Sequence, residues 1–173
     1  MGIEHASIGG SIMKKNMLIL LQAAMLIGMI LFVHMRMDIP EEKKIAEEKM
    51  VDYITSKVDT EAMERRDSQA MKRFLSLDHS SYEYCIYWKA KDTMTADEIV
   101  IVRFKDPEQA SDFAKKMETR IQDQLDVFDK YAPKQADLLR QATVETYTNY
   151  GVYIVSSEAD KLQESFEKKI GIE

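Results

Sequence analysis

Hydrophobic residues occur first in one long uninterrupted run and then in short periodic groups. From Met17 to Val33 the chain has no charged residue, and Gln22 is its only strongly polar member. A run of this length is at the lower limit of what crosses a bilayer. Lys14 and Lys15 come directly before it, as in the charged region of a secretory signal. We therefore predict a transmembrane anchor over residues 17–37, preceded by a short tail, residues 1–16.

The anchor is expected to stay attached to the mature chain. Ile30 to Val33, at the end of the run, are too large for the positions before a signal-peptidase cut. Met13 with the two lysines after it also has the pattern of a translation start, which would place residues 1–12 upstream of the protein. Basic residues occur on both sides of the run, but long domains translocate largely regardless of charge, so we predict that the C-terminal domain is extracytoplasmic.

Beyond the anchor the pattern predicts a juxtamembrane helix and one α+β domain. Helical spacing covers residues 40–58, within a juxtamembrane segment 38–59, and Thr60 is placed to cap a second helix at the start of a domain spanning 60–173. Alternating or β-branched runs predict four strands, at residues 82–89, 98–104, 143–148 and 152–155. Two hairpins separated by helices predict a four-stranded antiparallel sheet with helices packed on one face.

Three further helices follow from capping and spacing. Asp106 and Pro107 begin a long one, with Gln109 placed to reach back to the cap. Pro133 begins a short one, and Ser157 is expected to cap the last. The buried stripe of the long helix consists of Phe113, Met117, Ile121 and Phe128, with smaller members between them. In the final hairpin, Gly151 is expected to turn the chain with a positive φ.

Composition excludes several classes of function. The net charge is −6, and Glu4 is the only acidic residue before the end of the apolar run, so the domain carries the acidic excess. That sign argues against nucleic acid as a partner. Between Met29 and Ile170 the only glycine is Gly151, so no glycine-rich phosphate loop exists and we expect no nucleotide. We predict no cofactor, no metal site and no catalytic residues.

The single thiol and the domain's single histidine do not indicate catalysis. Cys85 alternates with large apolar residues in a predicted strand, which favours a packed thiol over a nucleophile. His79 has no second histidine or cysteine with which to share a metal, which favours a loop or helix-end residue over a ligand or base.

Aromatic and acidic positions give a candidate interaction surface. Trp88 and the tyrosines around it could form an aromatic platform, although such a strand is more often core. Asp97 and Glu98 could hold a cation weakly, although a solvated turn is the simpler interpretation. Tyr131 beside Pro133 could be a docking corner or only fix a bend. The candidate surface comprises Tyr87, Trp88, Asp97, Glu98, Tyr131 and Tyr153.

Three segments resemble a known family. They are Met94 to Ile99, Phe128 to Gln135, and Asn149 to Tyr153 leading into the closing helix. Over about residues 72–170 the chain resembles the uncharacterised bacterial envelope family called domain of unknown function 4358, found mainly in Gram-positive bacteria. The resemblance implies an envelope location, because members tend to carry a signal sequence or lipoprotein signal, and it implies no activity. The chain departs from the lipoprotein members because no lipobox cysteine follows its apolar run.

The leading functional hypothesis is a noncatalytic module, anchored in the membrane, that binds or positions an envelope protein. One alternative is an extracytoplasmic ligand sensor working with a membrane partner. The other is a hydrolase whose polar groups come together only in three dimensions. A cleft with clustered carboxylates would favour the enzyme, and a flat apolar patch would favour the partner module.

Overall fold

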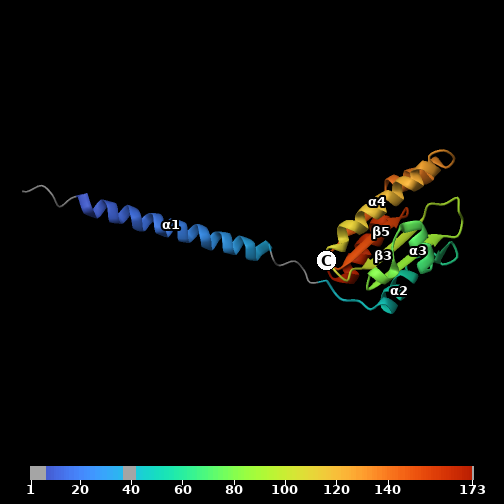
Figure 1. Cartoon of the computed structure of the whole chain (residues 1–173), viewed down its shortest axis with the longest axis horizontal. Helices are drawn as coiled ribbons and strands as arrows, with labels where there is room; N and C mark the ends of the chain where they lie inside the picture. The colour runs from blue at the N-terminus through green and yellow to red at the C-terminus, as the bar shows by residue number, and fades with distance from the viewer. Residues whose placement is uncertain (1–6, 37–41, 173) are drawn as a thin grey trace, which may run out of the picture. The chain divides into compact units, whose positions relative to one another are not determined.

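The computed structural model describes residues 7–36 and 42–172, which fall into two compact units, residues 1–40 and 41–173 (Figure 1). The first unit contains one helix, α1 (Ser7–Arg36). Within the described ranges, no helix is both long enough and apolar enough to cross a membrane. The predicted transmembrane anchor is therefore not confirmed, and Met37, its last residue, lies outside the described residues.

The second unit is built on an antiparallel sheet of five strands in the order β1-β2-β3-β5-β4. Their bounds are β1 Met63–Arg65, β2 Tyr84–Ala90, β3 Glu98–Arg103, β4 Thr143–Thr146 and β5 Tyr150–Val155. The α+β class and the two hairpins are as predicted, but the count of four strands is wrong. The missed strand, β1, pairs with the end of β2. Its three residues are too few to show an alternating pattern, and they lie inside the segment predicted as the second helix.

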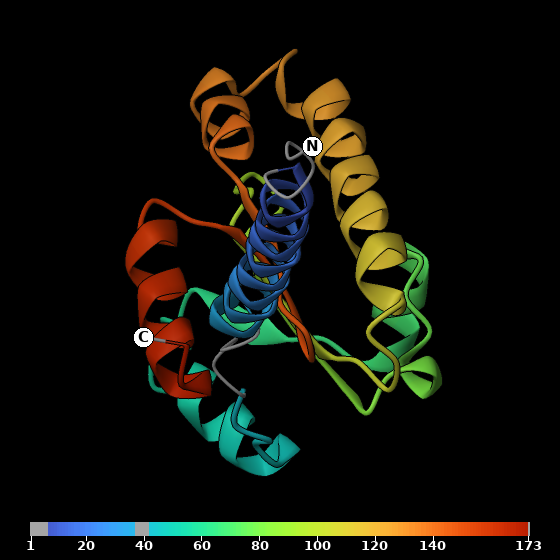
Figure 2. The same ribbon diagram turned by 90° about the vertical axis from the view of Figure 1, so that its left-hand side faces the viewer.

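Helices cover both faces of the sheet, so the prediction of helices on one face is wrong. One face packs against α2 (Glu47–Thr55) and α6 (Ala159–Ile170). The other packs against α3 (Ser68–Leu75), α4 (Gln109–Phe128) and α5 (Pro133–Arg140), with a 3-10 turn, η1 (His79–Ser81), beside α3. Figure 2 shows α6 and α4 on opposite sides of the strands. The physical reason is that β3 and β5 are buried on both sides, which requires a helical layer on each.

Residues 42–46 of this unit are not helical, and α2 begins at Glu47. Glu42 accepts hydrogen bonds from the backbone amides of Thr148 (2.5 Å) and Asn149 (2.7 Å). The Tyr150 hydroxyl donates to the Lys43 carbonyl (2.8 Å) and accepts from the Ile45 amide (3.0 Å). These bonds join residues 42–46 to the β4–β5 turn. The helix predicted from residue 40 therefore begins later, and Pro40 itself lies outside the described residues.

Two predicted caps are wrong. At the third, only the reach of Gln109 back to Asp106 is confirmed, because α4 begins at Gln109, not at Pro107, and its N-cap residue, Glu108, makes no side-chain cap. Asp67, not Thr60, caps the helix after β1, because its Oδ1 accepts from the Ala70 amide at 2.8 Å. At the start of α6 no side-chain cap is made, so Ser157 does not cap it. At α4, Gln109 Oε1 accepts from the Asp106 amide at 3.2 Å, as predicted.

The buried stripe of α4 is confirmed for Phe113, Met117 and Phe128, while Ile121 is half-buried. The expected role of Gly151 is wrong. Its φ is not positive, and it lies within β5. A Cβ at this position would lie 2.6 Å from Phe113 Cδ1 and 2.9 Å from Phe104 Cζ. Glycine is therefore needed to let two aromatic rings approach the strand, not to turn the chain.

Candidate functional site

The start of β3 places consecutive acidic residues on opposite faces of the sheet. Side chains alternate along a strand. Asp97 and Ile99 line a pocket on the α2/α6 face, whereas Glu98 points toward α4 on the other face. The β2–β3 hairpin therefore contributes to two separate polar features, a buried charge cluster and an open pocket.

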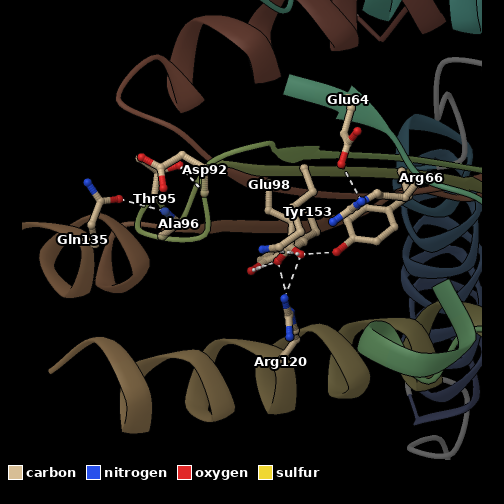
Figure 3. Close-up of polar contacts among 11 residues, drawn as sticks. Glu64, Arg66, Asp92, Thr95, Ala96, Glu98, Arg120, Gln135 and Tyr153 are labelled. Atoms are coloured by element: carbon tan, nitrogen blue, oxygen red, sulfur yellow. Dashed lines mark hydrogen bonds and ion pairs between the residues drawn. The ribbon is translucent and has the colours of Figure 1, made fainter. Parts of the chain in front are cut away.

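The charge cluster surrounds Glu98, which is only 1% exposed. Arg120 reaches from α4 and donates from Nε to Oε2 (3.1 Å) and from Nη2 to Oε1 (2.9 Å), as Figure 3 shows. Lys89 Nζ lies 3.5 Å from Oε1. The Tyr153 hydroxyl donates to Oε2 at 3.3 Å, and the Tyr87 hydroxyl donates to Oε1. Both oxygens are thus fully engaged with protein donors.

The cluster keeps its charges because they compensate one another. Burial alone would raise the pKa of Glu98, but the hydrogen bonds and charge of Arg120, with Lys89, lower it overall. Burial lowers the pKa of Lys89, partly offset by Glu98. Burial, together with the Glu98 charge, raises the pKa values of Tyr87 and Tyr153. The two tyrosines therefore stay protonated donors. The cluster holds α4 on the sheet and leaves no acceptor for a substrate.

The pocket has a volume of about 790 Å³ and lies at the opposite face. It is formed by the segment between α2 and β1, the β2–β3 hairpin and the first turns of α6. Its apolar wall consists of Val58, Met63, Ile99 and Leu162. Its acidic residues are Asp59, Glu61, Asp92, Asp97 and Glu158, and its basic residues are Lys57, Lys91 and Lys161. Carboxylates outnumber amines around an apolar interior.

The six candidate surface residues do not form one surface. Tyr87, Trp88, Glu98 and Tyr153 are buried, so an aromatic platform is not available on β2, and the solvated-turn interpretation is wrong for Glu98. The turn is solvated over residues 91–94, but the strand begins at Glu98. Asp97 is half-buried and lines the pocket. The remaining residue, Tyr131, is 48% exposed after the end of α4 and contacts the Phe128 ring.

Sequence reasoning missed Arg120 and Lys89. A signal for Arg120 was present, because it lies three residues after Met117 and seven after Phe113, on the same helical stripe. A charge on a buried stripe indicates a buried partner of opposite sign. The partner, Glu98, is the only carboxylate within the predicted second strand.

The thiol and the histidine lie apart from the pocket. Cys85 is buried in β2, and burial raises its pKa to about 12, as expected for a packed thiol. His79 lies in η1 and is half-buried. In the part of the chain that the structure describes, no group of three or more histidine, cysteine, aspartate or glutamate side chains is arranged to hold a metal.

A family model described as Domain of unknown function (DUF4358) matches residues 56–156. The chain belongs to the DUF4358 family. This confirms the resemblance seen in the sequence, with the match beginning earlier and ending before α6. The DUF4358 match includes all five strands, the Glu98 cluster and every wall of the pocket except the part from α6. Neither the curated proteins nor the solved structures contain a match to the chain.

Proposed function

We propose that the domain is a noncatalytic binding module that captures a segment of a partner protein in the pocket beside Asp97. The observation that carries the proposal is the pocket itself. Its volume of about 790 Å³ falls in the range of ligand sites, and it combines an apolar wall with a few polar groups. The opening lies between two loops and a helix end, where an extended segment can enter without disturbing the sheet.

A cleft with clustered carboxylates would favour the hydrolase, and the pocket is lined by five carboxylates. Asp59 and Asp92 accept from backbone amides, however, and Glu158 pairs with Lys161.

Two further features favour binding over hydrolysis. The most buried carboxylate, Glu98, has both oxygens engaged by Arg120, Lys89 and the two tyrosines, so it has no free position from which to act as a base. The thiol of Cys85 is buried with a pKa of about 12, so the nucleophilic thiolate is not formed near neutral pH. A small-ligand sensor would use the same pocket and is the second candidate.

Membrane attachment and an extracytoplasmic location are part of the proposal. They are supported by the apolar run from Met17 to Val33 and by α1, where Leu20, Leu21 and Met25 are 71%, 68% and 79% exposed. Such side chains favour lipid over water. Alkaline carbonate should leave the chain in the membrane fraction, and protease added to intact protoplasts should digest the domain. Release by carbonate, or full protection from protease, would contradict this part.

The pocket is tested by photocrosslinking in intact cells. Benzoylphenylalanine replaces Thr95 at the pocket rim or, as a control, Glu118, which is exposed on α4 on the opposite side of the sheet. We expect a discrete protein adduct from the Thr95 position and none from the Glu118 position. A chain whose mass rises only by that of a small molecule, with no second protein attached, would favour the sensor. No adduct at Thr95, with the chain accumulating normally, would overturn the proposal.

A further inference from the structure

The basic residues of the pocket already have partners. Lys161 Nζ lies 2.6 Å from Glu158 Oε2. Lys91 Nζ donates to the backbone carbonyls of Thr60 and Glu61, both at 2.9 Å. Lys57 Nζ lies over the Tyr53 ring, 5.8 Å from its centre. Lys161 therefore pairs with one acidic residue of the pocket, Glu158, and none of the three amines pairs with Asp97.

Two of the acidic residues are also engaged, but by the backbone. Asp59 Oδ1 accepts from the amides of Glu61 (2.9 Å) and Ala62 (3.3 Å) and shapes the loop before β1. Asp92 Oδ1 accepts from the Met94 amide at 2.8 Å and shapes the hairpin turn. These carboxylates fix the two loops that form the pocket opening.

Asp97 differs from the other carboxylates. It is half-buried at the start of β3, next to Ile99 on the pocket wall. Within the described residues its carboxylate makes no ion pair and receives no hydrogen bond from another residue. Burial raises its pKa, with Lys89 opposing from a distance. A partly desolvated carboxylate without a close cation is unfavourable, and a cation brought by a ligand would remove that cost.

The walls beside Asp97 suit an apolar stem. Met63 comes from β1 and Ile99 from β3, the strands on either side of β2. Val58 and Leu162 come from the α2–β1 segment and α6. A lysine or arginine side chain has this form, because its methylene groups contact apolar surface while its charged end meets a carboxylate.

We propose that the partner segment inserts a lysine or arginine side chain into the pocket, with its aliphatic stem between Ile99 and Leu162 and its charged end at Asp97. This inference rests on the proposed function. The pocket thus selects basic segments. The excess of carboxylates around the opening favours the approach of such a segment as well as its final position.

The test uses the full chain in a non-ionic detergent and three acetylated, amidated alanine pentapeptides. The central residue is lysine in the first peptide, norleucine in the second and glutamate in the third. Norleucine has the aliphatic stem without the amine. Binding is followed by amide chemical shifts in NMR titrations. We expect the lysine peptide to bind most tightly and to shift the amides of Asp97, Ile99 and Leu162. Asp97→Asn should weaken its binding about tenfold, the order expected for one partly buried charge pair. Asp126→Asn, on the exposed side of α4, should leave binding unchanged.

Each other outcome overturns the inference. Equal binding of the lysine and norleucine peptides, or equal binding to the wild type and to a normally folded Asp97→Asn variant, would show that charge is not selected. If the lysine peptide does not bind while Thr95 still crosslinks to a partner, the basic-segment inference fails and the binding module stands. If the lysine peptide does not bind and Thr95 forms no protein adduct, both the basic-segment inference and the proposed binding module fail.

Discussion

Replacing Arg120 by methionine is the most informative perturbation of the fold. Arg120 is 7% exposed and forms a bidentate ion pair, at 2.9 and 3.1 Å, with a glutamate that is 1% exposed. Methionine keeps most of the volume of the side chain but removes the cation. Among the described residues, Glu98 would then be left with Lys89, at 3.5 Å, as its only paired cation. Breaking a buried pair in this way costs about 3–5 kcal/mol.

The free energy of unfolding of the full chain would be measured by denaturant titration, followed by the fluorescence of Trp88, its only tryptophan. Lys116→Met is the matched control, because Lys116 lies on the same helix and pairs with the exposed Asp112 at 2.7 Å. The unfolding free energy lost in Lys116→Met should stay below about 1 kcal/mol.

A double variant separates pairing from packing. Arg120→Met combined with Glu98→Gln should lose less free energy than the two single variants added together, because each single variant leaves a buried group without its partner. If Arg120→Met costs no more than Lys116→Met, the cluster does not hold α4 on the sheet and the reasoning is refuted.

Three further predictions concern stability and reactivity. Gly151→Ala should cost about 1–3 kcal/mol in unfolding free energy, because the new Cβ would lie 2.6 Å from the Phe113 ring. Combining it with Phe113→Leu should recover part of the loss. An unchanged midpoint of denaturant unfolding in Gly151→Ala would refute the close approach. Cys85 should resist alkylation by iodoacetamide at pH 8 until the chain unfolds, as read by mass spectrometry, and rapid labelling of the folded chain would contradict its burial. Because the pKa of Glu98 is lowered in the folded state, its contribution to stability is present above the ordinary pKa of 4.5 and is lost as the pH falls below it. Glu98→Gln should therefore flatten the decline of the unfolding free energy at acid pH. An equally steep decline in the variant would refute this prediction.

The sequence was a good guide where the pattern is long or local chemistry is specific. The stripe of α4 follows from helical spacing over many residues, and Gln109 reaches back to the Asp106 amide as its position indicates. The non-helical segment before α2 could not be foreseen from local spacing, which resembles a helix there. The segment is fixed by long-range bonds between Glu42 and the Thr148 amide and between the Lys43 carbonyl and the Tyr150 hydroxyl. The second helical layer follows from strands apolar on both faces. That signal is present in β3, whose residues from Glu98 to Val102 are buried on both faces.

The candidate site was predicted in part. Asp97 was named from its place in the hairpin, and it does line the pocket. Glu98 was named with it, but strand alternation directs it to the opposite face, into contact with Arg120. The pocket itself could not be foreseen, since its walls come from segments about 100 residues apart, from Val58 to Leu162. Only the order of strands brings them together.

The most direct test of binding in this pocket combines crosslinking with a substitution that fills the pocket. Benzoylphenylalanine is kept at Thr95, and a second substitution is either Ala62→Phe, which places a ring in the pocket, or Ser111→Phe, an exposed position on α4. Both chains should accumulate to the same level in intact cells. We predict that Ala62→Phe abolishes the protein adduct and that Ser111→Phe leaves its yield unchanged. Equal adduct yields from the two chains would contradict the claim that the partner is bound in this pocket.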